Sequence, residues 1–240
     1  MKRRAGAVAS PPGLLVLPLA LLAALACGPQ EAAKPPAPDP ATLLESSAAA
    51  LRAQTSFHFE LLDRSDATIA LPGLILLKTQ GDWARPNRLV ASFDLKPVDV
   101  TARLKMEMRI LDRASYVSDP FSGKWSTVDA DLLPVNFLDF GDNIAKLMLR
   151  LEAPRYEGMA KIGRRSFHRV SGAIAPAAFG ILFYDVAREG RTSVEVLTDA
   201  GDGLPYQFTV RGRVLVTDPG DAERTLQISR FGLTVKVEPP

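Results

Sequence analysis

The stretch from Val98 to Leu111 constrains the fold more than any other, because apolar and polar side chains alternate through it almost without interruption. A period of two residues places alternate side chains on opposite faces of a β-strand. Alternation over this length is typical of an antiparallel sheet with one face in the core and the other in water. The residues that we predict to face the core are Val100, Ala102, Leu104, Met106, Met108 and Ile110.

Shorter segments with β-type patterning surround this strand. An apolar run that contains Leu74 and Leu76 follows a Pro-Gly pair, and Phe93 and Leu95 lie on one face of an alternating segment. Turn residues such as Gly163-Arg164 separate neighbouring segments. The other strands that we predict span residues 57–62, 88–95, 114–118, 125–128, 155–162, 166–171, 192–198, 205–216, 224–229 and 233–237.

Helical periodicity interrupts the strands at three places. Asp39-Pro40 suits a helix start, since Asp can cap the first turn and Pro fits the first helical position. A second helix is predicted from an Asp139 cap to about Arg150, with Leu147 and Met148 on its apolar face, and a third from Pro176 to about Val186. Few helices among many antiparallel strands predict an α+β fold, in which one large sheet curves around its helices.

The first 27 residues have the features of an export signal. Lys2, Arg3 and Arg4 form a basic head, and residues 14–26 are apolar apart from Pro18. The run is shorter than the roughly 20 apolar residues that span a bilayer, and small residues end it, as in a secretory signal peptide. We therefore predict a signal peptide at residues 1–26.

Cys27 is the only cysteine of the chain and directly follows the apolar run. The sequence Ala24-Leu25-Ala26-Cys27 resembles a bacterial lipobox, in which the cysteine is diacylated and becomes the mature N-terminus. The alternative is an ordinary cleavage after the Ala-x-Ala motif, which would leave Cys27 as a free thiol. An unpaired cysteine in an exported protein calls for an explanation, and a thioether to a lipid supplies one. This interpretation predicts an exported protein that is lipid-anchored to the outer face of the cell membrane.

Composition limits the partners of the mature chain. The 29 Lys and Arg residues include three in the basic head, and there are 27 Asp and Glu residues, so the mature protein is almost neutral. No basic excess is present to bind a phosphate backbone, and no nucleic acid partner is expected. Residues 27–40 hold the proposed acylation site and a Pro/Ala-rich linker. Residues 41–240 suit a single domain, which we expect to be monomeric.

Chemical motifs are scarce in the sequence. His58 and Glu60 share one strand face, a spacing compatible with two metal ligands, but no third ligand lies near them and a solvated sheet face is the better interpretation. Asp139-Phe140-Gly141 copies a kinase tripeptide without the loops that accompany it in kinases. We therefore expect no enzymatic activity, no metal site and no cofactor.

A succession of local patterns resembles the LppX/LprAFG family of exported lipoproteins. The patterns are Leu-Leu-Glu-Ser-Ser-Ala-Ala-Ala-Leu-Arg at residues 43–52, Gly81-Asp82 before Arg85-Pro86, Phe121-Ser-Gly-Lys-Trp125, and Ala153-Pro154 followed by Val170-Ser-Gly172. The apolar and aromatic stretch 178–191 departs from the family pattern. The resemblance implies a half-barrel similar to the lipoprotein carriers LolA and LolB, with an apolar cavity that holds an acylated lipid or glycolipid.

The implied function is carriage of that lipid across or within the cell envelope, with a membrane transporter as a candidate further partner. The alternative is an envelope sensor or regulatory module of the same architecture that binds a lipid or lipoprotein signal. Met side chains adapt to irregular apolar ligands, although all the apolar strand positions can equally pack on the helices. The candidate cavity residues are Leu74, Leu76, Phe93, Leu95, Leu104, Met106, Met108, Ile110, Leu147 and Met148, and the loops 129–140 and 172–190 are the candidate gates.

Overall fold

The computed structural model describes residues 36–65, 68–112, 114–129, 133 and 135–240. Residues 37–240 form one compact unit. The predicted signal peptide, Cys27 and the linker up to residue 35 lie outside the described residues. So do positions 130–132 and 134 of the first candidate gating loop.

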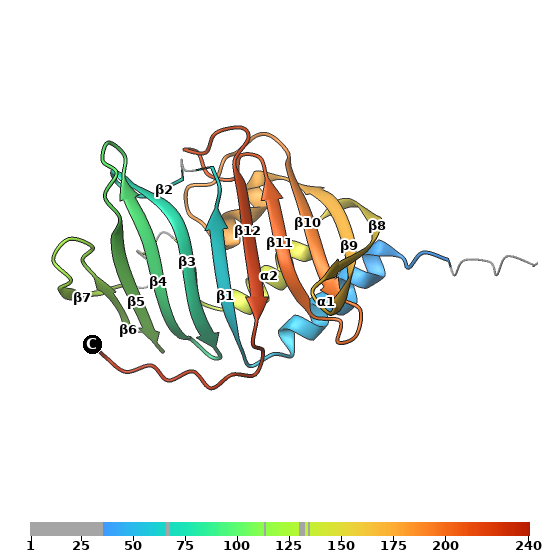
Figure 1. The fold of residues 1–240 in the computed structure, drawn as a ribbon, viewed down its shortest axis with the longest axis horizontal. Helices are drawn as coiled ribbons and strands as arrows, with labels where there is room; N and C mark the ends of the chain where they lie inside the picture. The colour runs from blue at the N-terminus through green and yellow to red at the C-terminus, as the bar shows by residue number, and fades with distance from the viewer. Residues whose placement is uncertain (1–35, 66–67, 113, 130–132, 134) are drawn as a thin grey trace, which may run out of the picture. The chain divides into compact units, whose positions relative to one another are not determined.

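A large antiparallel sheet dominates this unit (Figure 1). The described strands follow the order β7-β6-β5-β4-β3-β1-β12-β11-β10-β9-β8, and β2 pairs with β3 at one side of this path. Strand β1 therefore lies between two meanders: β3 to β7 on one side of it, and β8 to β12 on the other. The strands are β1 (Ser56–Asp63), β2 (Ile69–Leu71), β3 (Leu74–Ala84), β4 (Arg88–Pro97), β5 (Leu104–Leu111), β6 (Ala114–Ser118), β7 (Trp125–Val128), β8 (Glu152–Ile162), β9 (Arg165–Ile174), β10 (Thr192–Asp199), β11 (Pro205–Arg211) and β12 (Glu223–Ser229).

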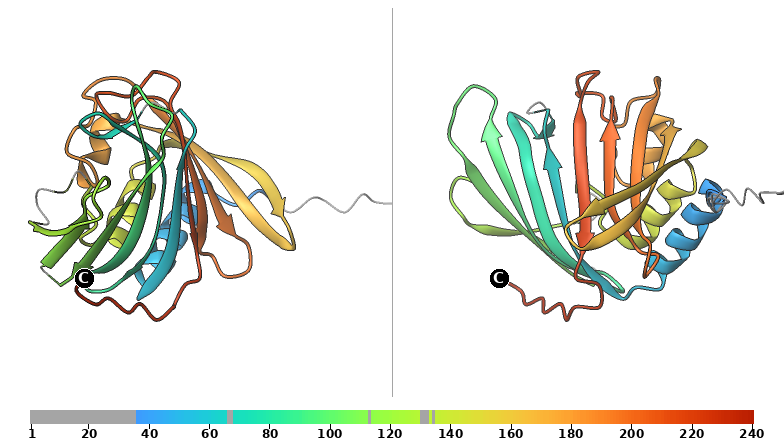
Figure 2. Two further views of the ribbon diagram at one scale, coloured as in Figure 1. Left: turned by 60° about the vertical axis from the view of Figure 1, so that its left-hand side comes forward. Right: turned by 45° about the vertical axis from the view of Figure 1, so that its right-hand side comes forward.

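Both α-helices lie against the same, concave face of the sheet (Figure 2). Helix α1 (Pro40–Arg52) begins as predicted, because the Asp39 carboxylate accepts a hydrogen bond from the Thr42 N–H at 2.8 Å. Leu44, Ala48 and Leu51 bury the face that the sequence pattern predicts. Helix α2 (Phe140–Met148) packs beside α1 and buries Phe140, Ile144, Leu147 and Met148, among others. Within the described ranges, no helix is long and apolar enough to cross a membrane.

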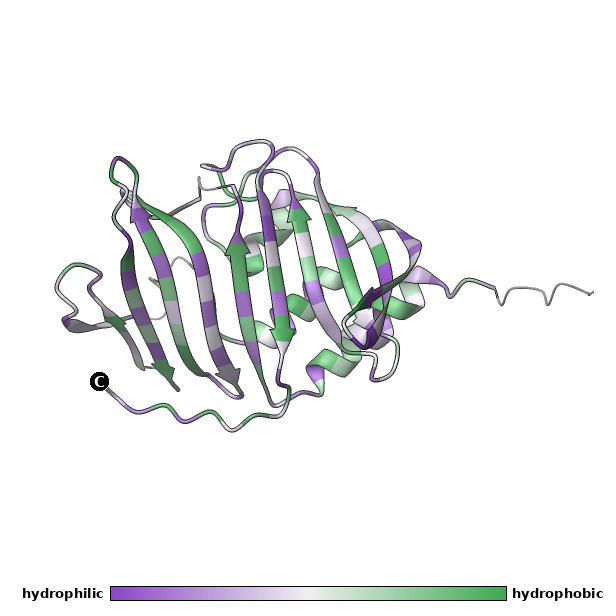
Figure 3. Cartoon of the chain, in the orientation of Figure 1, coloured by the Kyte–Doolittle hydropathy of each residue, from purple (hydrophilic) through white to green (hydrophobic). Residues whose placement is uncertain are grey.

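Alternation along the strands separates the two faces of the sheet. Hydrophobic and hydrophilic residues form stripes across the strands, as Figure 3 shows. Leu89, Ala91, Phe93 and Leu95 are buried on β4, and Met106, Met108 and Ile110 are buried opposite them on β5. The predicted α+β class is confirmed.

Two predicted strands are shorter in the structure than the sequence pattern suggests. The strand predicted from Val98 begins only at Leu104, because β4 ends at Pro97 and leaves residues 98–103 without a ladder partner. Val98 and Val100 are consequently exposed rather than buried. The strand predicted to end at Val216 stops at Arg211, where Gly212 adopts a positive φ and the chain turns.

Three further local predictions are wrong. Asp139 occupies the cap position of α2 in a left-handed conformation, and its side chain makes no capping hydrogen bond. The third helix is only a 3₁₀ helix, η2 (Pro176–Ile181). Residues 233–237 are extended but form no strand; the Leu233 carbonyl accepts a hydrogen bond from the Ser56 hydroxyl instead.

Strand direction gives the unit two distinct ends. Connections 64–68, 98–103, 119–124, 175–191 and 212–222 all lie at one end, which we call the loop end. Connections 53–55, 85–87, 163–164 and 200–204 lie at the other, which we call the turn end. In Figure 1 the connections 64–68, 98–103 and 212–222 are uppermost, whereas the hairpin 119–124 lies lower, at the left edge, because β6 pairs only with residues 108–111 of β5.

Candidate functional site

Aromatic side chains fill the concave face near the turn end. The ring centroids of Phe57 and Trp83 are 4.9 Å apart, and those of Phe59 and Phe140 are 5.1 Å apart. Helix α2 closes over this cluster at Gly141, where a Cβ atom would lie 3.2 Å from both the Phe57 and Trp83 rings. The close approach of helix and sheet leaves this part of the interior solidly packed.

The loop-end half of the same interior is hollow. A cavity of about 370 Å³ lies between strands β1 to β7 and the segments that cross the concave face. Its wall is apolar apart from Thr68, Thr79, Asp185 and the Tyr184 phenol. Lining side chains from the strands and connections are Phe59, Leu61, Leu71, Leu76, Phe93, Met106, Met108, Val117, Val128, Leu133, Val135, Phe137, Phe140, Leu182, Phe183, Leu215 and Leu226.

A second, smaller cavity of about 110 Å³ lies beside the first, over α2 and strands β9 to β12. Ile144, Leu147 and Met148 of α2 form one side of it. The two cavities share a wall, since seven residues line both of them. These are Leu61, Thr68, Leu76, Leu182, Phe183, Leu215 and Leu226.

Two segments meet across the concave face and cover the cavities. We call residues 135–138 and 179–183 together the strap. The Asn136 N–H donates to the Leu182 carbonyl at 2.7 Å, and Val135 and Phe183 form an antiparallel bridge. The strap therefore joins the described parts of the two loops that the sequence suggests as gates.

The Asn143 side chain fixes the strap to α2. Its amide group is buried and donates to the Leu138 carbonyl at 3.1 Å and to the Ile181 carbonyl at 3.3 Å. One side chain thus holds both segments of the strap. Since Leu182 and Phe183 follow Ile181 directly, this contact also positions part of the shared cavity wall.

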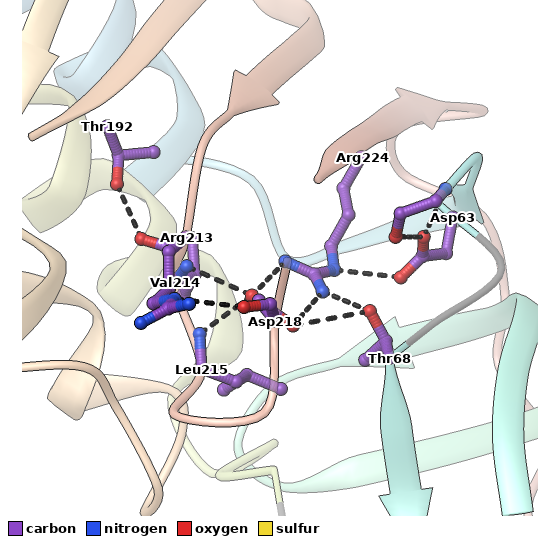
Figure 4. A network of polar contacts seen from close by, with 9 residues as sticks. Asp63, Thr68, Thr192, Arg213, Val214, Leu215, Asp218 and Arg224 are labelled. Atoms are coloured by element: carbon purple, nitrogen blue, oxygen red, sulfur yellow. Dashed lines mark hydrogen bonds and ion pairs between the residues drawn. The ribbon is translucent and has the colours of Figure 1, made fainter. Parts of the chain in front are cut away.

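A buried ionic cluster lies at the loop end of the cavities (Figure 4). Arg224 on β12 donates through Nε to Asp63 on β1 at 3.0 Å and through Nη1 to Asp218 at 2.8 Å. It also donates to the Thr68 hydroxyl. The Arg224 side chain is 8% exposed and both carboxylates are 0% exposed. The cluster ties β1, β12 and the connection 212–222 together.

Asp218 stays ionised in this buried position. Burial raises the pKa of its carboxyl group, but hydrogen bonds and charge from Arg224 and the N–H groups of Leu215 and Val214 outweigh burial and hold the pKa below its ordinary value. The two N–H groups donate to Asp218 Oδ2 at 2.7 and 2.9 Å. The carboxylate therefore fixes the turn that presents Leu215 to both cavities.

The structure separates the ten apolar candidates from the sequence into four groups. Leu76 lines both cavities; Phe93, Met106 and Met108 line the larger one, and Leu147 and Met148 line the smaller one. The remaining four line neither cavity: Leu74, Leu95, Leu104 and Ile110.

Sequence reasoning named the two loops that form the strap but missed the pairing between them, and it missed the ionic cluster. Strand alternation carries a signal for the cluster, since Asp63 follows Phe57, Phe59 and Leu61 on the inward face of β1, directly opposite Arg224. A charged residue at a core position predicts a buried partner. No comparable local signal marks Leu182 and Phe183, because their place in the wall depends on contacts with distant segments.

The other polar candidates have ordinary partners. His58 Nδ1 lies 2.6 Å from Asp82 Oδ1, and Glu60 pairs with Lys78 at 2.9 Å. In the part of the chain that the structure describes, no group of three His, Cys, Asp or Glu residues is placed to hold a metal ion. The pair of cavities is therefore the candidate functional site.

The family model of the LppX_LprAFG lipoproteins matches residues 39–237. The chain belongs to the LppX/LprAFG family. Among solved structures, LprF from Mycobacterium bovis superposes with a TM-score of 0.63 at 15% identity, over 85% of this chain and 98% of that one. LppX from Mycobacterium tuberculosis gives a TM-score of 0.57 at 17% identity, over 84% and 100% of the respective chains. No curated protein matches the sequence.

Membership of the LppX/LprAFG family accounts for the architecture and identifies the class of protein. The open antiparallel sheet around few helices is the half-barrel that the family resemblance implies, and both solved structures share this fold along nearly their whole length. The family is one of lipoproteins, in agreement with the lipobox-like sequence before residue 28. The fold is suited to bind lipid through the apolar interior described above.

Proposed function

We propose that this lipoprotein binds the acyl chains of a lipid or glycolipid in the larger cavity and carries that lipid within or across the cell envelope. The observation that supports the proposal is an apolar cavity of about 370 Å³ in the half of the interior that the aromatic cluster leaves open. A ligand site with an apolar wall and few polar groups is suited to hydrocarbon. Each methylene kept out of water contributes about 0.8 kcal/mol, so an apolar cavity retains an acyl chain against release into water.

In the proposed cycle, the protein takes a lipid from the membrane, shields its chains from water and releases it to an acceptor. Acylation of Cys27 would anchor the protein at the outer face of the membrane that supplies the lipid. A membrane transporter is a candidate supplier or acceptor. The chemistry of the ligand is unchanged throughout, and the strap and its neighbouring loops are the elements that must move to admit it.

Lipid extraction tests this proposal. Full-length protein purified from membranes is expected to carry lipid in stoichiometric amount, detectable by native mass spectrometry and by analysis of an organic extract. Met106→Trp and Met108→Trp each place a large ring in the cavity wall, and bound lipid should fall at least twofold in either variant. Val90→Trp is the control, because Val90 is next to Ala91 on β4 but is partly exposed on the other face.

Thermal unfolding of all three variants shows whether the fold is retained. A folded Met108→Trp protein with undiminished lipid content would contradict the assignment of this wall. A wild-type protein that is reproducibly free of lipid would contradict the carrier function itself.

A further inference from the structure

Exposed apolar side chains are concentrated at the loop end. Among the described residues, seven large apolar side chains are half or more exposed: Val98, Val100, Phe121, Met159, Ile162, Tyr184 and Val216. Five of them lie on loop-end connections. Met159 and Ile162 lie instead on β8, close to its turn with β9.

Two of these five side chains, Tyr184 and Val216, lie beside the larger cavity. Tyr184 lines the cavity itself, and Val216 directly follows the lining residue Leu215. The Val216 N–H donates to the Asp185 carbonyl at 3.0 Å, which places the two loops together.

The other three exposed side chains lie on connections that join cavity-lining strands. The Val98 N–H donates to the Gly73 carbonyl at 3.1 Å, close to the lining residue Leu71. Phe121 lies on the hairpin between Val117 and Val128, both of which line the wall. We call Val98, Val100, Phe121, Tyr184 and Val216 the rim.

At the opposite end, ion pairs lie on the turns beside the two exposed apolar side chains of β8. Arg165 pairs with Asp199 at 2.8 Å and with Asp202 at 2.6 Å, across two neighbouring turns. Arg85 pairs with Asp142 at 3.0 Å at a third turn. Charged side chains are favourable in contact with water, so the ion-paired turns at this end are suited to face the solvent.

We infer that the rim inserts into the lipid bilayer and holds the cavity entrance against the membrane surface; the inference rests on the proposed function. The rim residues are exposed on four separate connections, an arrangement that fits a fluid surface. Acidic and basic residues alternate on these loops without an excess of either sign, as in Asp99 with Arg103 and Asp119 with Lys124. Insertion is therefore driven by apolar burial and does not require anionic lipid.

The length of chain before the domain permits this orientation. Twelve linker residues, 28–39, separate Cys27 from the start of α1 and span at most about 40 Å when extended. Helix α1 ends at the turn end and runs obliquely for about 20 Å, at a rise of about 1.5 Å per residue, so that its start lies nearer the loop end (Figure 1). A protein acylated at Cys27 can thus bring its rim to the bilayer.

Site-specific labelling tests the inference on the full-length acylated protein. Because Cys27 is the only natural cysteine and is blocked by acylation, an introduced cysteine takes a maleimide fluorophore selectively. Phe121→Cys and Val100→Cys carry the probe on the rim, and Ile162→Cys is the matched control at the turn end. In neutral phosphatidylcholine vesicles, we expect the rim probes to gain at least twofold in intensity and to be quenched by lipids with a spin label on the acyl chain, while the control stays unchanged.

Equal responses at both ends, or no response on the rim, would overturn the inference. A rim response that requires added membrane proteins would also overturn it, in favour of a protein partner. The lipid content of the same samples is measured separately by extraction. Lipid without rim insertion contradicts only the docking inference, and rim insertion in a protein that never carries lipid contradicts only the proposed function.

Exchange kinetics provide a second readout. The combined variant Val98→Ser, Val100→Ser, Phe121→Ser and Val216→Ser should slow lipid transfer between vesicles at least fivefold, with the amount of bound lipid unchanged. None of these four residues lines a cavity. Met159→Ser with Ile162→Ser is the control and should transfer lipid at the wild-type rate; an equal loss in both proteins would refute the role of the rim.

Discussion

Replacing Arg224 with methionine should destabilise the protein strongly, because it strands two carboxylates in the interior. Arg224 is the cation that contacts both Asp63 and Asp218, and the side chains of both acids are fully buried. Removing one partner of a buried ion pair costs about 3–5 kcal/mol. For a domain of this size, about 1 kcal/mol corresponds to roughly 2–4 °C, so Tm should fall by roughly 6–20 °C.

The pH dependence of this loss of stability distinguishes two causes: buried carboxylates without a cation, and the lost packing of the Arg224 side chain. In the wild type the pKa of Asp218 is lowered, so its contribution to stability is present above the ordinary carboxyl range and is lost as the pH falls through the folded-state pKa. Without Arg224, burial raises the pKa of Asp218. Acidification then protonates this carboxylate and removes the cost of a buried, unpaired charge from the variant. The difference in Tm between wild type and Arg224→Met should therefore narrow between pH 7.5 and pH 5.

Differential scanning calorimetry across this pH range is the assay. Arg211→Met is the matched control, because Arg211 pairs with Glu223 at 2.9 Å but is half exposed, and its loss should cost less than about 1 kcal/mol. Adding Asp218→Asn to Arg224→Met should recover part of the stability. A Tm difference that stays constant with pH, or one no larger than that of the control, would refute the reasoning.

Three further variants examine the helix contact, the strap and the anchor. Gly141→Ala places a Cβ 3.2 Å from Phe57 and Trp83 and should cost about 1–3 kcal/mol despite its gain in helix propensity; a higher Tm would contradict the close contact. Asn143→Leu leaves the Ile181 and Leu138 carbonyls without this donor and should cost about 1–3 kcal/mol in chemical unfolding, with faster lipid exchange; unchanged exchange would mean that the strap does not control entry. Cys27→Ser should abolish metabolic incorporation of a palmitate analogue, and retained label would show that another residue is acylated.

The strand faces could be predicted from the sequence because burial on a sheet face has a period of two. Phe93 and Leu95 on β4, and Met106 and Met108 on β5, are buried as their alternation indicates. The same pattern continues from Val98 to Arg103, yet those residues are not in a strand. Alternation shows which side chains would face inward if a partner strand were present, and the partner here ends at Pro97.

The division of the interior into packed and hollow parts could not be predicted in this way. Met108 and Ile110 have the same pattern, the same strand and nearly the same burial, but only Met108 lines the cavity. What differs is the segment opposite: α2 closes on the sheet at Gly141, whereas the strap crosses the loop-end half. The position of Phe183 depends on its bridge to Val135, 48 positions away, and on the Asn143 amide, which holds Ile181 from 38 positions away.

The cavity itself implies a last prediction, that removing bound lipid destabilises the fold. Core deletions lose about 24 cal/mol for each Å³ of dry cavity, so a cavity of about 370 Å³ forgoes at most about 9 kcal/mol of packing when it is empty. A hydrocarbon ligand supplies the missing contacts and stabilises only the folded state. Protein stripped of lipid by mild detergent exchange should therefore unfold at lower temperature than the purified form, and adding back the extract should restore Tm. Met108→Trp fills part of the cavity, so its own Tm should depend less on lipid. An identical Tm before extraction, after extraction and after add-back would show that the cavity is not a lipid site.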